Sequence, residues 1–237
     1  MIYLPNFYGG MCNNLLQFNN ALEFLKHNEL DCTYLKINVK HTDKSRDKNN
    51  HLLRIFNELS KNYVNLKGSF IKNTQHILYN SYPPIKIDKN RDYILNHSFY
   101  AKDSSYSIYN YLRIFQYQKE IFERFRTILK NKLTCYHIRL GDFLTNPRFV
   151  KYVLPESEII KNINKNRYYL ILTNHESIDY IKRITNKFKN IIYAFDLKLQ
   201  LDEEFILGSI CENVIMSKNS SFSLLLSRFN KYFKEKI

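Results

Sequence analysis

The chain has 237 residues, of which 44% are hydrophobic, which is enough for one large or two small folded domains and argues against intrinsic disorder. With 36 Lys and Arg residues against 22 Asp and Glu residues, the formal net charge is +14. That charge favours an anionic partner: nucleic acid, a membrane face or a phosphorylated substrate. The basic residues form no block, however, so a background composition explains the charge equally well.

The spacing of the cysteines and the length of the apolar runs indicate the cellular location. Cys12, Cys32, Cys135 and Cys211 form no C-x-x-C pair, which argues against a zinc or disulfide scaffold and predicts reduced, mostly buried thiols. The N-terminus lacks the features of a signal peptide, and no apolar run approaches the ~20 residues that span a bilayer. We therefore expect a cytoplasmic protein, with electrostatic attachment to an anionic membrane surface as a second location.

The first half of the chain predicts a strand over 1–6, a glycine turn, a helix and a second strand over 31–38. The helix shows apolar residues at the helical period, at Leu15, Phe18, Leu22 and Leu25. Residues 40–51 predict a loop and residues 51–63 a helix. A strand with its exit loop follows over 92–100, and then a long helix with one apolar face, made of Ile121, Phe122, Phe125, Ile128 and Leu129. This order is typical of an α/β domain.

After Lys132 strands and helices alternate regularly. Four short apolar runs predict strands, over 133–138, 168–173, 190–196 and 213–217. Helical segments lie between or after them, over 155–166, 177–188, 203–211 and 221–233. Such alternation predicts a parallel sheet covered on both faces. We place a boundary near residue 131, between an N-terminal α/β lobe over 1–130 and a C-terminal Rossmann-like lobe over 131–237.

Three polar stretches follow predicted strands, where α/β lobes bind their ligands. In the first, "YGGMCNNLLQF", Gly9 and Gly10 permit close backbone approach. Asn13, Asn14 and Gln17 then offer amides to polar hydroxyls at the start of the helix. A plain turn with solvated amides is the alternative interpretation.

In the second stretch, "CYHIRLGDFL", a cation precedes a glycine turn. Arg139 offers a guanidinium that binds phosphate with paired hydrogen bonds and keeps its charge, near the turn at Gly141. His137 points to the same face by the strand period of two. Asp142 either orients Arg139 or accepts a proton. The alternative is an interior histidine beside a surface Arg–Asp pair.

In the third stretch, "SKNSSFSLLLSRF", Asn219, Ser220, Ser221 and Ser223 lie between a strand and an apolar helix. Serines at this position cap free amides, and a helix N-terminus also binds anions, so a cap alone is the alternative. The sequence contains no P-loop, no G-x-G-x-x-G fingerprint and no D-x-D segment for a metal-bound diphosphate.

Taken in order, these stretches resemble the alpha-1,2-fucosyltransferases and the wider superfamily with alpha-1,6- and protein O-fucosyltransferases. That family opens with a G-G-L-G-N-Q-x-x-Q turn, carries H-I-R-R-G-D-Y near mid-chain, and ends with L-M-S-x-C and N-S-S/T-F-S segments. Here the stretches read "GGMCNNLLQ", "HIRLGDF", "LGSIC" and "NSSFS", and "HSFYAKDSSY" stands at a Q-S-E-K-Y-like position.

The resemblance implies an α/β glycosyltransferase of the GT-B type, with two Rossmann-like lobes facing a cleft. It implies inverting, metal-independent transfer of L-fucose from GDP-fucose to a sugar hydroxyl such as that of a galactoside, with no cofactor. By position, Arg139 binds the diphosphate, and Asp142 is the second catalytic candidate. The other implied donor contacts are His137 and Glu204 at guanine and ribose, Gly141, Asn219, Ser220, Ser221 and Ser223 around the phosphates, and Gly9, Gly10, Asn13 and Gln17 from the first lobe.

The chain also differs from that family. Leu140 replaces its second arginine, Glu204 its guanine-side aspartate, and Thr173–Asn174–His175 its S-D-D segment. Two alternatives therefore stand beside fucosyl transfer: a non-catalytic relative that binds a nucleotide sugar or a glycan, and a glycosyltransferase that uses another nucleotide sugar. Nucleic acid is disfavoured as a partner, because the chain lacks the aromatic and basic motifs of RNA and DNA modules.

Overall fold

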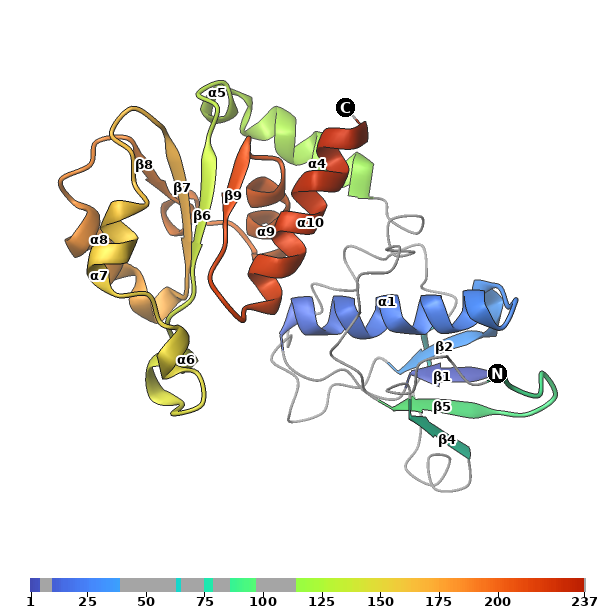
Figure 1. Cartoon of the computed structure of the whole chain (residues 1–237). Helices are drawn as coiled ribbons and strands as arrows, with labels where there is room; N and C mark the ends of the chain where they lie inside the picture. Colours follow the sequence, from blue (N-terminus) through green and yellow to red (C-terminus); the bar gives the residue numbers. More distant parts are fainter. Residues whose placement is uncertain (5–9, 39–62, 65–74, 79–85, 97–113, 237) are drawn as a thin grey trace. The chain divides into compact units, whose positions relative to one another are not determined.

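A computed structural model describes residues 1–4, 10–38, 63–64, 75–78, 86–96 and 114–236 (Figure 1). The chain forms two compact units, Met1–Phe115 and Gln116–Ile237, called the first and second unit below. Each unit is described by itself. The assignment of an acceptor-side and a nucleotide-side lobe to these units stays a prediction.

The first unit contains a parallel sheet with the strand order β3-β2-β1-β5-β4. Its strands are β1 (Ile2–Leu4), β2 (Leu35–Asn38), β3 (Tyr63–Val64), β4 (Gln75–Leu78) and β5 (Tyr93–Asn96). Ile2 of the central strand pairs with Leu35 on one side and Tyr93 on the other. The sheet therefore grows outward from β1 in both directions, as in doubly wound α/β domains.

Helix α1 (Met11–His27) connects β1 to the short helix η1 (Cys32–Tyr34) and β2. Its buried residues include the expected Leu15, Phe18, Leu22 and Leu25, together with four amide side chains, Asn14, Gln17, Asn19 and Asn20. The helix ends at His27 with Asn28 as its C-cap, and Glu29 then takes a left-handed φ of 54°. A helix this deeply covered is held mainly by packing, because its amide-rich N-terminal half gives little helical propensity.

The second unit is built on a parallel sheet with the order β8-β7-β6-β9. Its strands are β6 (Thr134–Ile138), β7 (Tyr169–Thr173), β8 (Ile191–Tyr193) and β9 (Asn213–Ile215). Strand β6 is buried along its whole length. Its helices are α4 (Ile114–Arg124), α5 (Arg126–Leu129), α6 (Asp142–Thr145), α7 (Glu156–Lys161), α8 (Ile178–Thr185), α9 (Leu201–Ser209) and α10 (Ser221–Lys236), with short turns η4 (Val150–Tyr152), η5 (His175–Ser177) and η6 (Ala194–Leu197).

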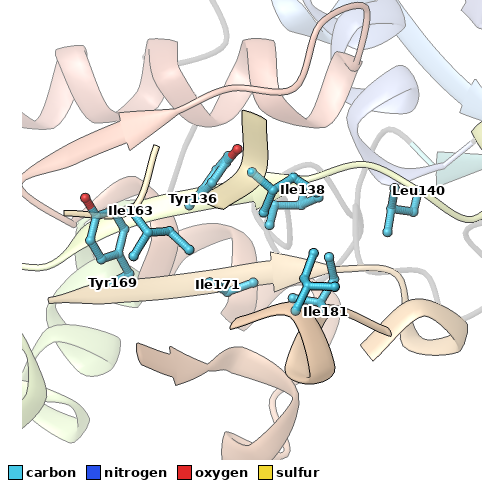
Figure 2. Packing of buried hydrophobic residues seen from close by; sticks show 9 residues of the cluster. Tyr136, Ile138, Leu140, Ile163, Tyr169, Ile171 and Ile181 are labelled. Carbon is cyan, nitrogen blue, oxygen red and sulfur yellow. The ribbon is translucent and has the colours of Figure 1, made fainter. Parts of the chain in front are cut away.

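The two faces of this sheet carry different layers of the core. Alternate residues of β6, Tyr136 and Ile138, pack with Ile159 and Ile163 from the α7 region and with Ile181 of α8 (Figure 2). On the other face, Gly208 of α9 lies against Cys135 of β6, and α9 packs against α10. This is the period-two alternation of a strand buried on both faces, as the sequence predicted.

Several sequence predictions need correction at their ends. Residues 31–38 are a strand only from Leu35, because the Asp31 side chain accepts a hydrogen bond from the Thr33 amide and starts the η1 turn. Residues 190–196 leave the strand after Tyr193 for η6. The long helix before residue 130 breaks at Phe125, and Phe122 is exposed rather than buried. The predicted loop over 40–51 and the helix over 51–62 lie outside the described residues, while Tyr63 begins β3.

Within the described part of the chain, no helix is both long enough and apolar enough to cross a bilayer. Three of the four cysteines are buried and all four are free thiols, as their spacing predicted.

Candidate functional site

The strand order of the second unit defines where a ligand is expected. From β6 the chain moves outward to β7 and β8, and it then returns to place β9 on the other side of β6. The carboxyl ends of β6 and β9 therefore border the topological switch point of this sheet, which is the usual ligand position in open α/β folds. Two of the predicted stretches, the one after β6 and the one after β9, meet at this point.

Arg139 is the first residue after β6. Its Nη2 atom lies 2.5 Å from Oδ1 of Asp142, and its guanidinium lies 5.5 Å from the centre of the Phe143 ring. The Arg139 side chain is 24% exposed and that of Asp142 is 31% exposed, so this ion pair is partly buried but still reaches solvent. Asp142 thus holds the guanidinium in place, which is one of the two roles expected for it. Guanidinium donors not used by Asp142 remain suited to an anionic oxygen.

Ser217 ties the end of β6 to the end of β9. Its hydroxyl accepts a hydrogen bond from the Arg139 amide at 2.8 Å and donates one to the His137 carbonyl at 2.8 Å. Its own amide donates to Oγ of Ser223 at 2.9 Å. Because the ladder between these strands ends at Tyr136 and Ile215, the serine side chain extends the strand pairing beyond the backbone ladder. Ser217 was not predicted, because a single serine after a strand gives no signal of its partner 80 residues earlier.

His137 is buried on the α10 side of β6. Its Nδ1 atom lies 2.6 Å from Oγ of Ser223, and its ring packs against the Phe222 ring with 4.7 Å between centres. Burial, together with the nearby Arg139 charge, lowers the pKa of His137 to about 3. The imidazole is therefore neutral at physiological pH and serves as a hydrogen-bonding group, not as a cation. This supports the interior-histidine interpretation for the ring itself.

Gly141 forms the predicted turn after Arg139. Its φ is +50° and its ψ is −119°, a combination that favours glycine. An added Cβ would lie 2.8 Å from both Cγ of Asn174 and Oε1 of Glu176. The amides of Leu140 and Gly141 donate to Asn174 and Ser177, which come from the segment after β7. Neither side chain was predicted as part of the site.

Leu140 occupies the position of the family's second arginine. Its side chain is 1% exposed and packs within the same apolar cluster as Tyr136 and Ile138 (Figure 2). A charged side chain here would enter the core, which carries a large desolvation cost. In this protein position 140 therefore contributes to the core, and Arg139 is the single guanidinium in the segment over 135–144.

The serines after β9 include a helix cap. The Ser220 hydroxyl accepts a hydrogen bond from the Ser223 amide at 3.3 Å, which is the geometry of an N-cap residue. The preceding Asn219 has a left-handed φ of 54°, which asparagine tolerates better than most residues. Capping is thus confirmed for Ser220. Ser221 opens α10 and is half-buried, whereas Ser223 is buried and bonded to His137 and Ser217.

Glu204 lies on α9, one helical turn before Gly208. Its carboxyl group is partly buried, and burial raises its pKa to about 7. The pKa of the Cys135 thiol on β6 is raised mainly by burial, and the negative charge of Glu204 raises it further. A carboxyl group that titrates near neutrality and carries no described partner is suited to a polar ligand.

The predicted residues of the first unit are only partly described. Gly9 lies outside the described residues. Gly10 is the N-cap of α1 with φ −82°, and an added Cβ there would meet nothing within 4 Å, so a plain turn explains it. Asn13 is half-buried and Gln17 is buried. Ligand contacts by these residues stay predictions.

The site gathers Arg139, Asp142, Gly141, His137, Ser220 and Ser223 at one end of one sheet, together with Ser217 and Phe222, which were not predicted. Within the described residues, no group of three His, Cys, Asp or Glu side chains is arranged to hold a metal ion.

Known protein structures share this fold. The fucosyltransferase NodZ from Bradyrhizobium matches with a TM-score of 0.55 and 9% identity, covering 97% of this chain and 92% of that one. NodZ alpha-1,6-fucosyltransferase co-crystallised with GDP matches with a TM-score of 0.53 and 10% identity over 97% of this chain and 91% of that one. POFUT1 in complex with GDP matches with a TM-score of 0.56 and 11% identity over 97% and 95%.

At these identities the likeness establishes the fold. The chain is an α/β protein with two parallel sheets, matching fucosyltransferases of the GT-B class. The family models that were searched do not match the chain, and neither does any curated protein sequence.

Proposed function

We propose that the protein is an inverting glycosyltransferase that uses a GDP-linked sugar, with GDP-fucose as donor and a sugar hydroxyl as acceptor. One observation carries the proposal: Arg139, backed by Asp142, stands at the switch point of the second sheet. Solved structures with the same fold, NodZ and POFUT1, were crystallised with GDP, which supports a guanine nucleotide as the ligand. The galactoside acceptor and the alpha-1,2 linkage follow from the motif resemblance.

The proposed chemistry follows from charge. Cleavage of the bond between the sugar anomeric carbon and the phosphate oxygen leaves the electron pair, and thus negative charge, on GDP. The fixed Arg139 guanidinium and the amides at the start of α10 stabilise that charge as it develops. The acceptor hydroxyl attacks the anomeric carbon from the opposite side and gives its proton to a base, which inverts the configuration. We assign Asp142 to orienting Arg139, and no metal or cofactor takes part.

The remaining predicted contacts complete this proposal. We expect His137 and Glu204 to lie beside guanine and ribose, and Asn219, Ser220 and Ser221 near the phosphates. Contacts by Gly10, Asn13 and Gln17 stay predictions from the motif resemblance.

A second function is favoured by one observation. Leu140 is buried where the resembling family carries a second arginine, so this chain has one guanidinium fewer for the leaving diphosphate. The absence of this guanidinium is consistent with a protein that binds a nucleotide sugar without transferring the sugar. The two functions agree on binding and differ on turnover.

The test is a titration calorimetry panel with GDP, UDP, ADP and GDP-fucose, followed by an assay of GDP release with and without galactoside acceptors. We expect GDP and GDP-fucose to bind and the other nucleotides to bind at least tenfold more weakly, about 1.4 kcal/mol. Binding with acceptor-dependent GDP release supports the transferase. Binding without release supports the non-catalytic relative, and a preference for UDP contradicts both.

A further inference from the structure

The hydrogen bonds around His137 determine which ring nitrogen carries its proton. Oγ of Ser223 lies 2.6 Å from Nδ1 and accepts a hydrogen bond from the Ser217 amide at 2.9 Å. The serine hydroxyl has a single hydrogen to donate. Since the buried ring is neutral, only one of its two nitrogens is protonated.

Two proton arrangements fit these heavy atoms. In the first, the Ser223 hydroxyl donates to Nδ1, and the ring proton is on Nε2. In the second, Nδ1–H donates to Ser223, whose oxygen then accepts two hydrogen bonds while its own hydrogen needs another acceptor. No described residue provides that acceptor, and Ser223 is 1% exposed. A buried hydroxyl hydrogen without an acceptor is unfavourable, so the first arrangement is preferred.

The first arrangement gives a directed chain of donors. The Ser217 amide donates to Ser223, the Ser223 hydroxyl donates to Nδ1 of His137, and Nε2–H is left to donate onward. Among the described residues Nε2 has no hydrogen-bond partner. The ring orientation is fixed by Phe222 and by the contact between Nδ1 and the Ser223 hydroxyl, and the Ser217 hydroxyl holds the His137 carbonyl.

We propose that Ser217 and Ser223 are positioning residues that hold His137 as the Nε2-protonated tautomer, so that it offers a neutral N–H donor to an oxygen of the bound nucleotide. The part concerning the nucleotide rests on the proposed function, whereas the tautomer does not. A donor without a full charge suits a ring beside Arg139, because a second cation would be repelled there. Ser223 therefore acts through His137 and not by touching a phosphate.

Histidine ¹⁵N NMR of the full-length protein at pH 7, without ligand, tests the tautomer. The two-bond proton–nitrogen correlations of a neutral imidazole distinguish the protonated nitrogen from the bare one, and a His137→Gln variant assigns the signals. We expect Nε2 protonated and Nδ1 bare in the wild type. A ring protonated on Nδ1, or on both nitrogens, overturns the inference.

Nucleotide affinity tests the positioning role. Ser223→Ala should abolish the single-tautomer signature and raise the Kd for GDP about five- to tenfold, the scale of the net contribution of one ordinary hydrogen bond. Ser209→Ala is the matched control, because Ser209 is a buried serine of the same unit whose hydroxyl donates only to the Ile206 carbonyl. That control should leave both readouts unchanged.

The outcomes separate the two claims. If the wild type binds no GDP but shows Nε2–H, the proposed function fails and the tautomer inference stands. If Ser223→Ala changes the tautomer but binds GDP as the wild type does, the positioning role is wrong. If Ser223→Ala does not fold, Ser223→Thr and Ser223→Val replace it as a pair, and only the threonine, which keeps the hydroxyl that meets Nδ1, should retain the wild-type tautomer and affinity.

Discussion

Gly208 is the residue on which the contact between α9 and the second sheet depends. A Cβ at this position would lie 2.9 Å from Cδ1 of Leu172, 3.0 Å from Sγ of Cys135 and 3.1 Å from Cδ1 of Leu226. All three neighbours are at most 2% exposed, so none can move into solvent. Gly208→Ala is therefore expected to force α9 away from β6 and β7.

Two opposing terms set the size of this effect. Overpacking of a core by one methyl group costs about 1–3 kcal/mol. Alanine in turn stabilises the helix by up to about 1 kcal/mol, because glycine is the poorer helix former. With three contacts at or near 3 Å, overpacking dominates, and we expect the free energy of unfolding to fall by about 1–2 kcal/mol.

Urea unfolding, followed by circular dichroism, measures this change as a lower midpoint at constant slope. A double-mutant cycle with Cys135→Ala provides the control, because removing Sγ opens space for the new methyl group. We expect Gly208→Ala to cost at least about 0.5 kcal/mol less in that background. A more stable Gly208→Ala variant, as helix propensity alone predicts, would refute the reasoning.

Two further predictions concern buried polar groups. The pKa of Glu204 is raised from an ordinary 4.5 to about 7, so the folded protein keeps a proton that the unfolded chain has already released. The free energy of unfolding should therefore fall as pH rises from about 4.5 to 7 and then level off. With allowance for the partial exposure of Glu204, the loss in the free energy of unfolding is about 1–3 kcal/mol. In Glu204→Gln the urea midpoints at pH 5 and pH 8 should be nearly equal, whereas the same pH dependence in the variant and the wild type would exclude Glu204 as the cause. Asn230 donates from Nδ2 to the carbonyls of Ser209 at 2.9 Å and Cys211 at 2.6 Å. Asn230→Ala should therefore destabilise the protein by about 2 kcal/mol and speed amide exchange at the end of α9, and unchanged exchange there would count against this role.

The parallel sheet of the second unit was predictable from the sequence because its central strands are continuous apolar runs, whereas β3 and β4 of the first unit were not predicted. The run over 133–138 became β6, and the run over 168–173 became β7. Buried parallel strands give this signal because both of their faces are covered. The C-terminal helices were predictable because they combine apolar residues at the helical period with polar flanks.

Local turn geometry explains two of the departures from the predicted strands. Asp31 turns the chain at Cys32–Tyr34 by accepting the Thr33 amide, although the sequence alternates like a strand. After Tyr193 the chain forms a turn that ends at Lys198 with a left-handed φ of 52°. Hydrophobic periodicity carries no information on either event.

The candidate site was predictable only where a residue type carries its own chemistry. Arg139 and Gly141 stood out because a cation before a glycine turn is unusual in a chain with five glycines. Ser217, Asn174 and Ser177 did not, since each acts through a partner 34 to 80 residues away. Such contacts exist only once the strands are in register.

The Arg139 guanidinium is the group that we expect to bind a nucleoside diphosphate. Titration calorimetry of GDP with Arg139→Ala tests it, beside Arg126→Ala as control, because the Arg126 side chain is 64% exposed and its nearest acidic partner, Glu123, is 3.9 Å away. We predict that Arg139→Ala weakens GDP binding about thirtyfold, equivalent to ~2 kcal/mol, and that Arg126→Ala leaves it unchanged. Equal GDP affinity of Arg139→Ala and the wild type would contradict the account.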